Sequence, residues 1–181
     1  MPRTLLNSAL LVAVVFTLLS CVKDTDFEQA DDIALTPEAE VNFLYFTLTI
    51  DDFESQSISE EELAVIDTTE IRFLDDEFAI ENITRADFFF KVTNTFPVGL
   101  DVNLRFLSED NVPYYEINFP IALSENNSPE VTEFTQVVSM EEIEQLTQND
   151  KVAVRINIES DNQDLDGSLN LQSKTTYYLQ F

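Results

Sequence analysis

Apolar and polar residues alternate with a period of two along most of the chain after residue 40. In Arg85–Thr93 every second residue is apolar, and most of the residues between them are charged or polar. This alternation is typical of a β-strand with one buried face. The same pattern predicts strands over Asn42–Ile50, Arg85–Thr93, Leu100–Phe106, Tyr115–Ile121, Val131–Val138, Val152–Ile158 and Leu169–Phe181, with shorter candidates at Leu63–Ile66 and Ile71–Leu74.

Details within the strands predict where some of them lie. Asn42–Ile50 is apolar on both sides near its start, which favours a central strand that is covered on both faces. Pro113 and Pro120 bracket the row from Tyr115, and proline, which has no backbone N–H, indicates an edge strand or a break. Phe89 and Tyr178 should face away from their apolar neighbours. We expect them to pack against the edge of the other layer, the alternative being an aromatic contact patch.

One segment changes from strand-like to helix-like spacing. Ser139 and Glu142 stand three residues apart, as in a capping box, where each side chain bonds the other residue's backbone. Ile143 and Leu146 then supply a narrow apolar stripe. The spacing predicts one short helix near residues 139–148.

Seven or eight strands, short turns and one helix, without a regular strand–helix rhythm, predict an all-β fold. We expect a single antiparallel immunoglobulin-like β-sandwich over residues 41–181, with Asp51–Glu62 as an acidic loop. Lys91–Leu107 contains Asn94, Phe96-Pro97 and a Leu-x-Val-x-Leu-x-Phe row, and it resembles the late-embryogenesis-abundant type 2 (WHy) β-sandwich domain. This resemblance implies the fold and no activity.

The amino-terminal residues have the pattern of a secretory signal. Arg3 precedes an apolar run of eleven residues, Ala9–Leu19, whereas a membrane-spanning helix needs about 20. Leu18-Leu19-Ser20-Cys21 resembles the lipobox of bacterial lipoproteins, in which signal peptidase II cleaves before a diacylglyceryl-modified cysteine. The resemblance implies that residues 1–20 are removed and that Cys21 carries acyl chains such as palmitate, which anchor the protein in a membrane. The alternative is an ordinary cleaved signal with a chance cysteine.

Residues 21–40 are predicted to be an acidic, flexible tether. Repulsion between their carboxylates favours an extended chain of roughly 60 Å. Val22 stands where an aspartate would signal retention in the inner membrane, so we expect the outer membrane. Lys23–Asp26 and Glu28 resemble the acidic export signals of surface lipoproteins in Bacteroidota. The sequence does not decide whether the protein is displayed on the cell surface or on the periplasmic face of the outer membrane.

The composition narrows the chemistry. The chain has 35 Asp+Glu against 9 Lys+Arg, a formal charge of −26, which disfavours nucleic acid and anionic lipid as partners. It has no His and a single Cys, so His-based catalytic triads, disulfides and most zinc sites are excluded. It also has no Trp, which weakens a stacking-based carbohydrate site.

One loop has the spacing of a calcium site. Asn162, Asp164, Asp166 and Ser168 place oxygen-bearing side chains on alternate positions, with Gly167 permitting a sharp bend. A hairpin turn is the alternative, because Asp-Gly is a preferred turn dipeptide. Calcium is therefore a possible ligand, and no cofactor is required.

We expect a non-catalytic, membrane-anchored envelope lipoprotein that binds or braces another envelope protein or a surface polymer. The first alternative is a calcium-dependent ligand-binding or adhesion module. A remote alternative is a hydrolase that uses paired carboxylates, for which the candidates are Asp51-Asp52, Asp75–Glu77 and Glu141-Glu142.

Overall fold

The computed structural model describes residues 36–56, 63–71, 77–125, 128–158 and 165–181. Within them lie eight strands and three helices. The strands are β1 (Glu38–Thr49), β2 (Leu63–Glu70), β3 (Ile83–Asn94), β4 (Leu100–Leu107), β5 (Pro113–Ile121), β6 (Glu130–Val138), β7 (Lys151–Ile158) and β8 (Ser168–Leu179). The helices are α2 (Ile50–Gln56), α3 (Glu77–Asn82) and α4 (Met140–Leu146). Among these residues no helix combines the length and apolar character needed to cross a bilayer.

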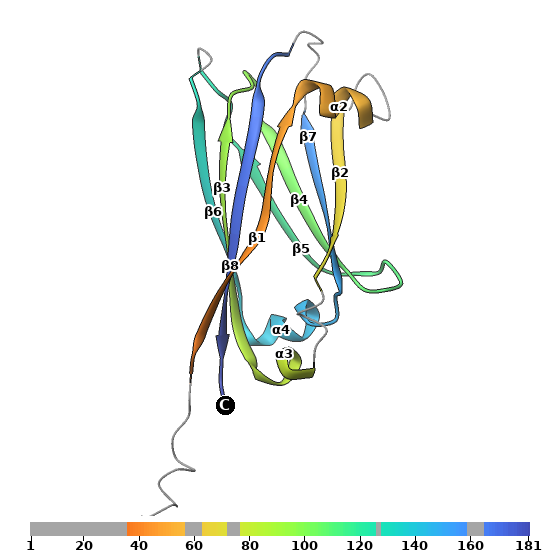
Figure 1. Cartoon of the computed structure of the whole chain (residues 1–181), viewed down its shortest axis with the longest axis vertical. Helices are drawn as coiled ribbons and strands as arrows, with labels where there is room; N and C mark the ends of the chain where they lie inside the picture. Colours follow the sequence, from red (N-terminus) through yellow and green to blue (C-terminus); the bar gives the residue numbers. More distant parts are fainter. Residues whose placement is uncertain (1–35, 57–62, 72–76, 126–127, 159–164) are drawn as a thin grey trace, which may run out of the picture. The chain divides into compact units, whose positions relative to one another are not determined.

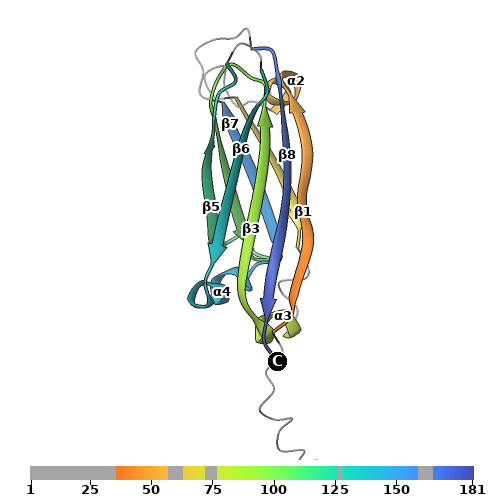
Figure 2. The same ribbon diagram turned by 90° about the vertical axis from the view of Figure 1, so that its left-hand side faces the viewer.

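The strands form two four-stranded antiparallel sheets that face each other (Figures 1 and 2). The first sheet has the order β1-β8-β3-β6 and the second has the order β2-β7-β4-β5. The prediction of an antiparallel β-sandwich is confirmed. In the described chain three short helices, rather than one, accompany the sheets.

The strand connections are those of a jelly roll rather than of an immunoglobulin domain. β4 pairs with β5, β3 with β6, β2 with β7 and β1 with β8, so the chain forms one nested hairpin that is folded into two sheets. An immunoglobulin domain instead divides seven strands as ABED and CFG. Alternation along a strand predicts which of its faces is buried but not which strands pair with it. The alternating pattern therefore could not distinguish immunoglobulin-like connections from those of a jelly roll.

β1 is an edge strand, and the prediction of a central one is wrong. The pairing of β1 with β8 shifts between Asn42 and Tyr45, which is the sign of a β-bulge. Because of the bulge, Phe43 and Leu44 both belong to the core, while Tyr45 is 76% exposed. The strand also begins at Glu38, so the last three residues of the predicted tether belong to the sheet.

β2 and α2 differ from their predictions as well. β2 is one continuous strand, and Ile71 follows its end, while residues 72–74 lie outside the described part. The start of the predicted acidic loop is helix α2, with Thr49 and Asp52 at its amino end. Phe53 of α2 is fully buried and meets the ring of Phe96 edge-on at 5.8 Å. A single buried aromatic residue gives no periodic stripe, which is why the pattern did not indicate this helix.

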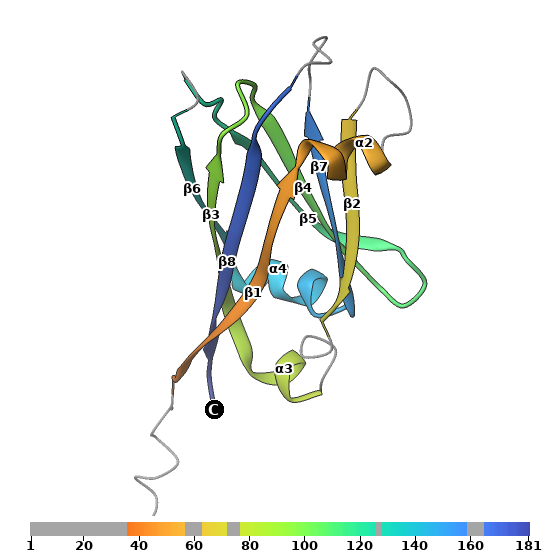
Figure 3. The same ribbon diagram turned by 45° about the horizontal axis from the view of Figure 1, so that its top comes forward.

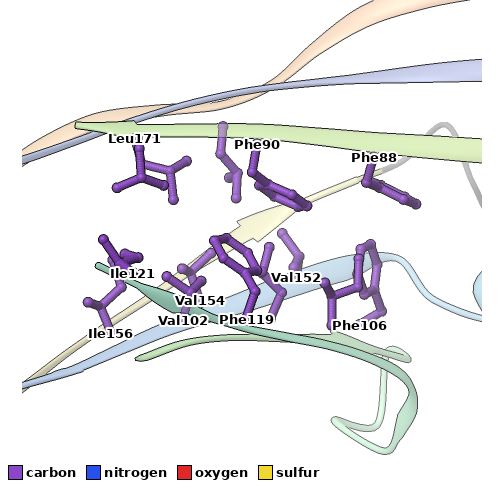
Figure 4. Packing of buried hydrophobic residues seen from close by; sticks show 14 of the residues in the cluster. Phe88, Phe90, Val102, Phe106, Phe119, Ile121, Val152, Val154, Ile156 and Leu171 are labelled. Carbon is purple, nitrogen blue, oxygen red and sulfur yellow. The ribbon is translucent and has the colours of Figure 1, made fainter. Parts of the chain in front are cut away.

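The core lies between the two sheets and is rich in phenylalanine (Figure 4). Phe88 and Phe90 of β3 point at Phe106 of β4 and Phe119 of β5, with ring centroids 5.3 Å and 5.0 Å apart. Each buried Phe contributes about 1.5–3 kcal/mol relative to an exposed one. The alternation predicted for β3 is confirmed, because Ala86, Phe88, Phe90 and Val92 are all buried.

The expectation that Phe89 and Tyr178 pack on the other layer is wrong for Tyr178, whose contacts lie within its own sheet. Phe89 and Tyr178 are both half-buried. The Arg85 guanidinium lies 4.9 Å from the centre of the Tyr178 ring, and the Tyr178 hydroxyl donates to Asp87 at 3.2 Å. Side chains of the neighbouring strand thus cover part of the Tyr178 ring.

Helix α4 confirms the predicted capping box. The carboxylate of Glu142 accepts hydrogen bonds from the backbone N–H of Ser139 at 3.0 Å and from its hydroxyl at 2.8 Å. Ile143 and Leu146 are buried, as their spacing predicts. The helix ends at Leu146, two residues before the predicted end.

Candidate functional site

The predicted calcium loop is described only in part. Asn162 and Asp164 lie outside the described residues, and Asp166 is exposed. Ser168 is held by Thr95 instead: its backbone N–H donates to Thr95 Oγ1 at 2.7 Å, and its carbonyl accepts from the Thr95 N–H at 2.9 Å. Over the described residues, no group of three or more Asp, Glu, Cys or His could hold a metal ion. The calcium site stays a prediction.

The glycine of this loop has a packing role. Gly167 has φ of +156°, and a Cβ built there would lie 2.8 Å from the backbone nitrogen of Phe96. Two segments far apart in sequence therefore touch where only glycine fits. This close approach accounts for Gly167 without a metal ion.

Cys21, the predicted lipid-attachment residue, lies outside the described residues. The lipid anchor therefore stays a prediction from the sequence.

Two of the carboxylates considered for hydrolysis cap helices. Asp52 accepts from the Thr49 backbone N–H at 2.8 Å and from the Thr49 hydroxyl at 2.9 Å, while Glu142 caps α4 through Ser139. These hydrogen bonds lower the pKa of both carboxyl groups. A general acid in a glycosidase needs a raised pKa, so neither side chain is suited to that role. Asp75 and Asp76 lie outside the described residues.

A polar hollow of about 460 Å³ is the most developed candidate site. It opens on the outer face of β4, β5 and β7 and is bounded by Asp101, Val102, Asn103, Arg105, Asn118, Phe119, Pro120, Arg155 and Asn157. The inward residues Val102 and Phe119 belong to the core, so the outward residues set the chemistry. We call this site the polar hollow.

The sheet register explains why these residues meet. Asn103 of β4 stands between Asn118 of β5 and Arg155 of β7, and Asp101 stands between Pro120 and Asn157 in the next row. Successive outward residues of three neighbouring strands thus form two parallel rows. Because strands lie about 4.8 Å apart, the rows place these groups across a span that suits a small extended ligand.

Hydrogen bonds between the side chains orient the site. Asn103 donates from Nδ2 to Asn118 Oδ1 at 2.5 Å, and Arg155 donates from Nε to Asn157 Oδ1 at 2.7 Å. Arg105 is paired with Glu116 at 3.0 Å at one end of the hollow. An amide carries two N–H donors and one carbonyl oxygen, so Asn103, Asn118 and Asn157 have more hydrogen-bonding capacity than this network uses.

The local charge differs from that of the whole chain. Arg105 and Arg155 are two of the 9 Lys+Arg in the sequence, and they line the hollow with Asp101 as its one acidic residue. Together with three asparagines, they make a site that is rich in fixed donors and close to neutral. Such a site can bind hydroxyl or carboxylate groups by multiple hydrogen bonds.

Sequence reasoning missed the polar hollow. Asn103, Asn118 and Asn157 occupy outward positions of predicted strands, where polar residues are ordinary. Only the pairing of β4 with both β5 and β7 brings them together, and that pairing is not visible in alternation. An unusual concentration of Asn and Arg at outward positions was the one available signal.

Comparison with known proteins gives a likeness of fold. No protein-family model and no curated protein matches the chain. It is similar to the crystal structure of a protein proposed to be secreted from Parabacteroides distasonis, with 15% identity and a TM-score of 0.47 over 64% of this chain. It is also similar to the VP2 subviral particle of infectious bursal disease virus, with 11% identity and a TM-score of 0.47 over 79% of this chain.

A third similar structure is the enzymatically active domain of tailspike protein 4 from bacteriophage CBA120. It has 12% identity and a TM-score of 0.40 over 76% of this chain. The chain spans 38%, 32% and 19% of the three structures in the order given. At these identities and scores, the likeness extends to the β-sandwich alone.

Proposed function

We propose that this protein is a non-catalytic envelope lipoprotein, anchored in the outer membrane through Cys21, whose jelly roll binds a saccharide polymer in the polar hollow. The anchor is supported by the lipobox-like Leu18–Cys21. The binding role is supported by one observation above all, the preoriented rows of amide and guanidinium groups on one sheet face.

The chemistry of these groups favours a saccharide. Sugar hydroxyls both donate and accept, and an asparagine amide offers a donor and an acceptor side by side. Because Asn103 and Arg155 are already held by neighbouring side chains, little side-chain entropy is lost when a ligand binds. The exposed ring of Pro120 adds an apolar surface at the edge, where a stacking tryptophan is not available.

The position of the hollow within the sandwich supports the same role. β1 begins at the lower end of the domain in Figure 1, and β4 begins at the upper end, beside the end of β7. The hollow includes Asp101 and Asn157, which pair with each other near that upper end. The hollow therefore reaches toward the end of the domain opposite Glu38, where the strand β1 begins. A polymer can approach the domain from that end.

The anchor is tested by labelling cells with radioactive palmitate. Label should enter the wild-type protein and be lost from a Cys21→Ser variant. Equal labelling of both proteins, or none in either, would contradict the anchor. Protease shaving of intact cells, with a periplasmic protein as control, then distinguishes surface display from the periplasmic face.

The binding site is tested by electrophoresis through gels that contain a soluble polysaccharide. Dextran serves as a neutral probe and alginate as a carboxylated one, so the two gels separate hydroxyl recognition from carboxylate recognition. We expect retardation of the wild-type protein in at least one gel, and an apparent affinity at least fivefold weaker for Asn103→Ala and Arg155→Ala.

Matched controls lie on the outer face of the other sheet. Asn42→Ala and Arg85→Ala remove the same side chains from β1 and β3 and should leave the retardation unchanged. If the wild-type protein moves freely in both gels, or if the controls lose as much affinity as the hollow variants, the saccharide proposal is wrong.

A further inference from the structure

Phe78 and Phe181 form an exposed aromatic pair at one end of the sandwich. Their ring centroids lie 5.6 Å apart, and the two residues are 48% and 50% exposed. Every other phenylalanine in the described ranges is buried or half-buried. The contact between the two rings therefore covers them only in part, in a domain that otherwise keeps its phenylalanines from water.

Helix α3 adds a third apolar residue to this end. Ile80 is as exposed as Phe181 and stands two residues after Phe78 in the helix. A surface helix normally turns its large apolar side chains toward the core, whereas α3 exposes both of these. Clustered exposed apolar residues mark surfaces that contact a partner or a membrane. We call Phe78, Ile80 and Phe181 the apolar tip.

The apolar tip lies where the chain enters the sandwich. The carbonyl of Pro37, the residue before β1, accepts from the Leu179 N–H at 3.0 Å. The Gln180 N–H donates to the carbonyl of Asn82, the last residue of α3, at 2.9 Å. The start of β1, the end of α3 and the residues after β8 therefore lie side by side, at the lower end of the domain in Figures 1 and 3.

We propose that the apolar tip rests on the lipid bilayer that holds Cys21, with its three side chains at the boundary between headgroups and acyl chains. The inference rests on the proposed lipid anchor. Apolar side chains gain free energy at that boundary in proportion to the area they bury. The anchor strengthens the contact, because a linked second contact forms at an effective concentration on the order of millimolar.

The attachment point selects this end of the domain. Residues 22–36 separate Cys21 from Pro37, and a chain of that length reaches about 55 Å at most. The 12 residues of β3 span roughly 40 Å, so the opposite end of the sandwich lies roughly that much farther from the entry point. With the tip on the bilayer, the end of the polar hollow at Asp101 points away from the membrane and stays accessible.

The charge around the tip selects the lipid headgroup. Glu77 and Glu81 of α3 and Glu38 of β1 are exposed, and α3 contains no Lys or Arg. Anionic lipids repel these carboxylates, whereas the amine of a zwitterionic headgroup attracts them. The tip therefore fits a zwitterionic surface, unlike the Lys- and Arg-rich helices that bind anionic membranes.

A second copy of this chain is a poor occupant of the tip. Each chain carries a formal charge of −26, so two chains repel each other. Three side chains that are about half exposed offer roughly 300 Å², since a whole aromatic side chain buries about 150–250 Å². A stable protein interface needs about 800 Å² from each partner, whereas a bilayer contact that the anchor holds in place needs far less.

The test uses the absence of Trp from the chain, because one introduced Trp then reports on one position. Phe78→Trp and Phe181→Trp place it in the tip. Leu123→Trp is the matched control: Leu123 is 48% exposed, and it follows Ala122, which is bonded by Asn94 at the far end of β3. Each acylated protein is purified from membranes and reconstituted in phosphatidylcholine vesicles, with and without lipids brominated near the headgroup.

We expect bromine to quench the Trp fluorescence of both tip variants at least threefold more than that of Leu123→Trp. Replacing half of the phosphatidylcholine by phosphatidylglycerol at low salt should reduce the quenching at least twofold. Adding Phe78→Ser and Ile80→Ser to the Phe181→Trp protein should reduce it by a similar factor, because two of the three apolar side chains are then lost.

The single cysteine separates this test from the test of the anchor. If cells do not acylate Cys21, the palmitate experiment fails, and the thiol of the purified protein is then coupled to a maleimide lipid in the same vesicles. Excess quenching of the tip variants in the coupled protein supports the apolar tip without the natural anchor.

Three results would overturn the proposal. One is equal quenching of the tip variants and Leu123→Trp, whichever way the protein is attached. Another is quenching that is unchanged by the Phe78→Ser and Ile80→Ser substitutions. The third is a blue-shifted tip fluorescence without bromine quenching that appears only at dense protein coverage, which would indicate that two copies pair through the tip.

Discussion

The two lateral sides of the sandwich are built differently. Between β5 and β6, Phe119 and Phe134 stack with centroids 4.7 Å apart, and Gln136 donates to the Tyr115 hydroxyl at 3.1 Å. Between β1 and β2 there are two hollows, and Ile66 is 47% exposed. Figure 2 shows β5 and β6 on one side and β8 and β1 towards the other.

The difference shows that the β5/β6 side of the sandwich is packed more closely than the β1/β2 side. A sheet edge that is covered by stacked rings is protected from pairing with another chain, whereas an uncovered edge needs other protection. On the β1/β2 side the bulge of β1 interrupts the regular pairing of that strand.

The largest expected effect on stability comes from removing one aromatic ring from each side of the sandwich. Phe119→Ala deletes a buried ring in contact with Phe90 and Phe134 and should cost about 3–5 kcal/mol of unfolding free energy. Phe46→Ala, on the half-buried β1/β2 side, should cost about 1–2 kcal/mol, since little packing is lost there. Urea denaturation measures both variants. Equal losses would mean that the β1/β2 side is packed as tightly as the other.

The next effect concerns two tyrosines, one near each side. Burial raises the pKa of Tyr177 to about 12 and also raises the pKa of Tyr115. A tyrosine whose folded pKa lies above its unfolded value keeps its full stabilisation below about pH 10. The stabilisation is lost as the pH rises through the folded value, because the unfolded chain releases the proton first.

For Tyr177 we expect a loss of about 2–3 kcal/mol of unfolding free energy between pH 10 and 12. Tyr177→Phe should flatten this part of the stability curve, and Tyr115→Phe should flatten it less. Urea titrations at several pH values measure both slopes. Parallel curves for wild-type protein and Tyr177→Phe would show that this tyrosine titrates in the folded protein as it does in the unfolded chain.

A smaller effect is expected from a substitution at the bulge of β1. The Ser173 hydroxyl accepts from the Leu44 N–H at 2.8 Å and donates to the Leu44 carbonyl at 3.2 Å. Ser173→Ala leaves both backbone groups without this partner and should cost about 1–2 kcal/mol. Amide exchange should quicken at Leu44 and not at Thr135 of β6. An equal increase at both amides would mean that the whole domain had been loosened.

How far the sequence predicts this molecule depends on the range of the interactions involved. β3 and α4 follow local rules, since alternation fixes one and a four-residue cap fixes the other, and both predictions are confirmed. β1 departs from its prediction because a bulge turns Phe43 and Leu44 to the same side. A register shift is a property of two strands, and one strand's pattern does not contain it.

The candidate sites depend even more on pairing. The polar hollow needs β4 to lie between β5 and β7, and the smaller hollow beside Phe46, Val65 and Asp67 needs β1 and β2 to end their sheets. The sequence places Asn103 and Asp67 on strands but does not say which residues become their neighbours. The jelly-roll connections supply that information, and they result from the whole chain folding as one nested hairpin.

The smallest effect concerns the cap of α4, a helix whose residues contact β3, β5 and β6. Hydrogen bonds from Ser139 lower the pKa of Glu142, so the stabilisation is complete above the unfolded value near 4.5 and is lost as the pH falls through the lower folded value. Since Glu142 is solvent-accessible, Glu142→Gln should cost only about 0.5–1 kcal/mol at pH 7. The cost should shrink as the pH falls through the folded value and the wild-type carboxyl group becomes protonated. Urea denaturation at pH 7 and pH 3 measures the difference, with Glu141→Gln, the exposed neighbour outside the cap, as control. If the two variants lose the same unfolding free energy at pH 7, the cap does not stabilise the β5/β6 side. The stability of that side would then come from the stacked rings alone.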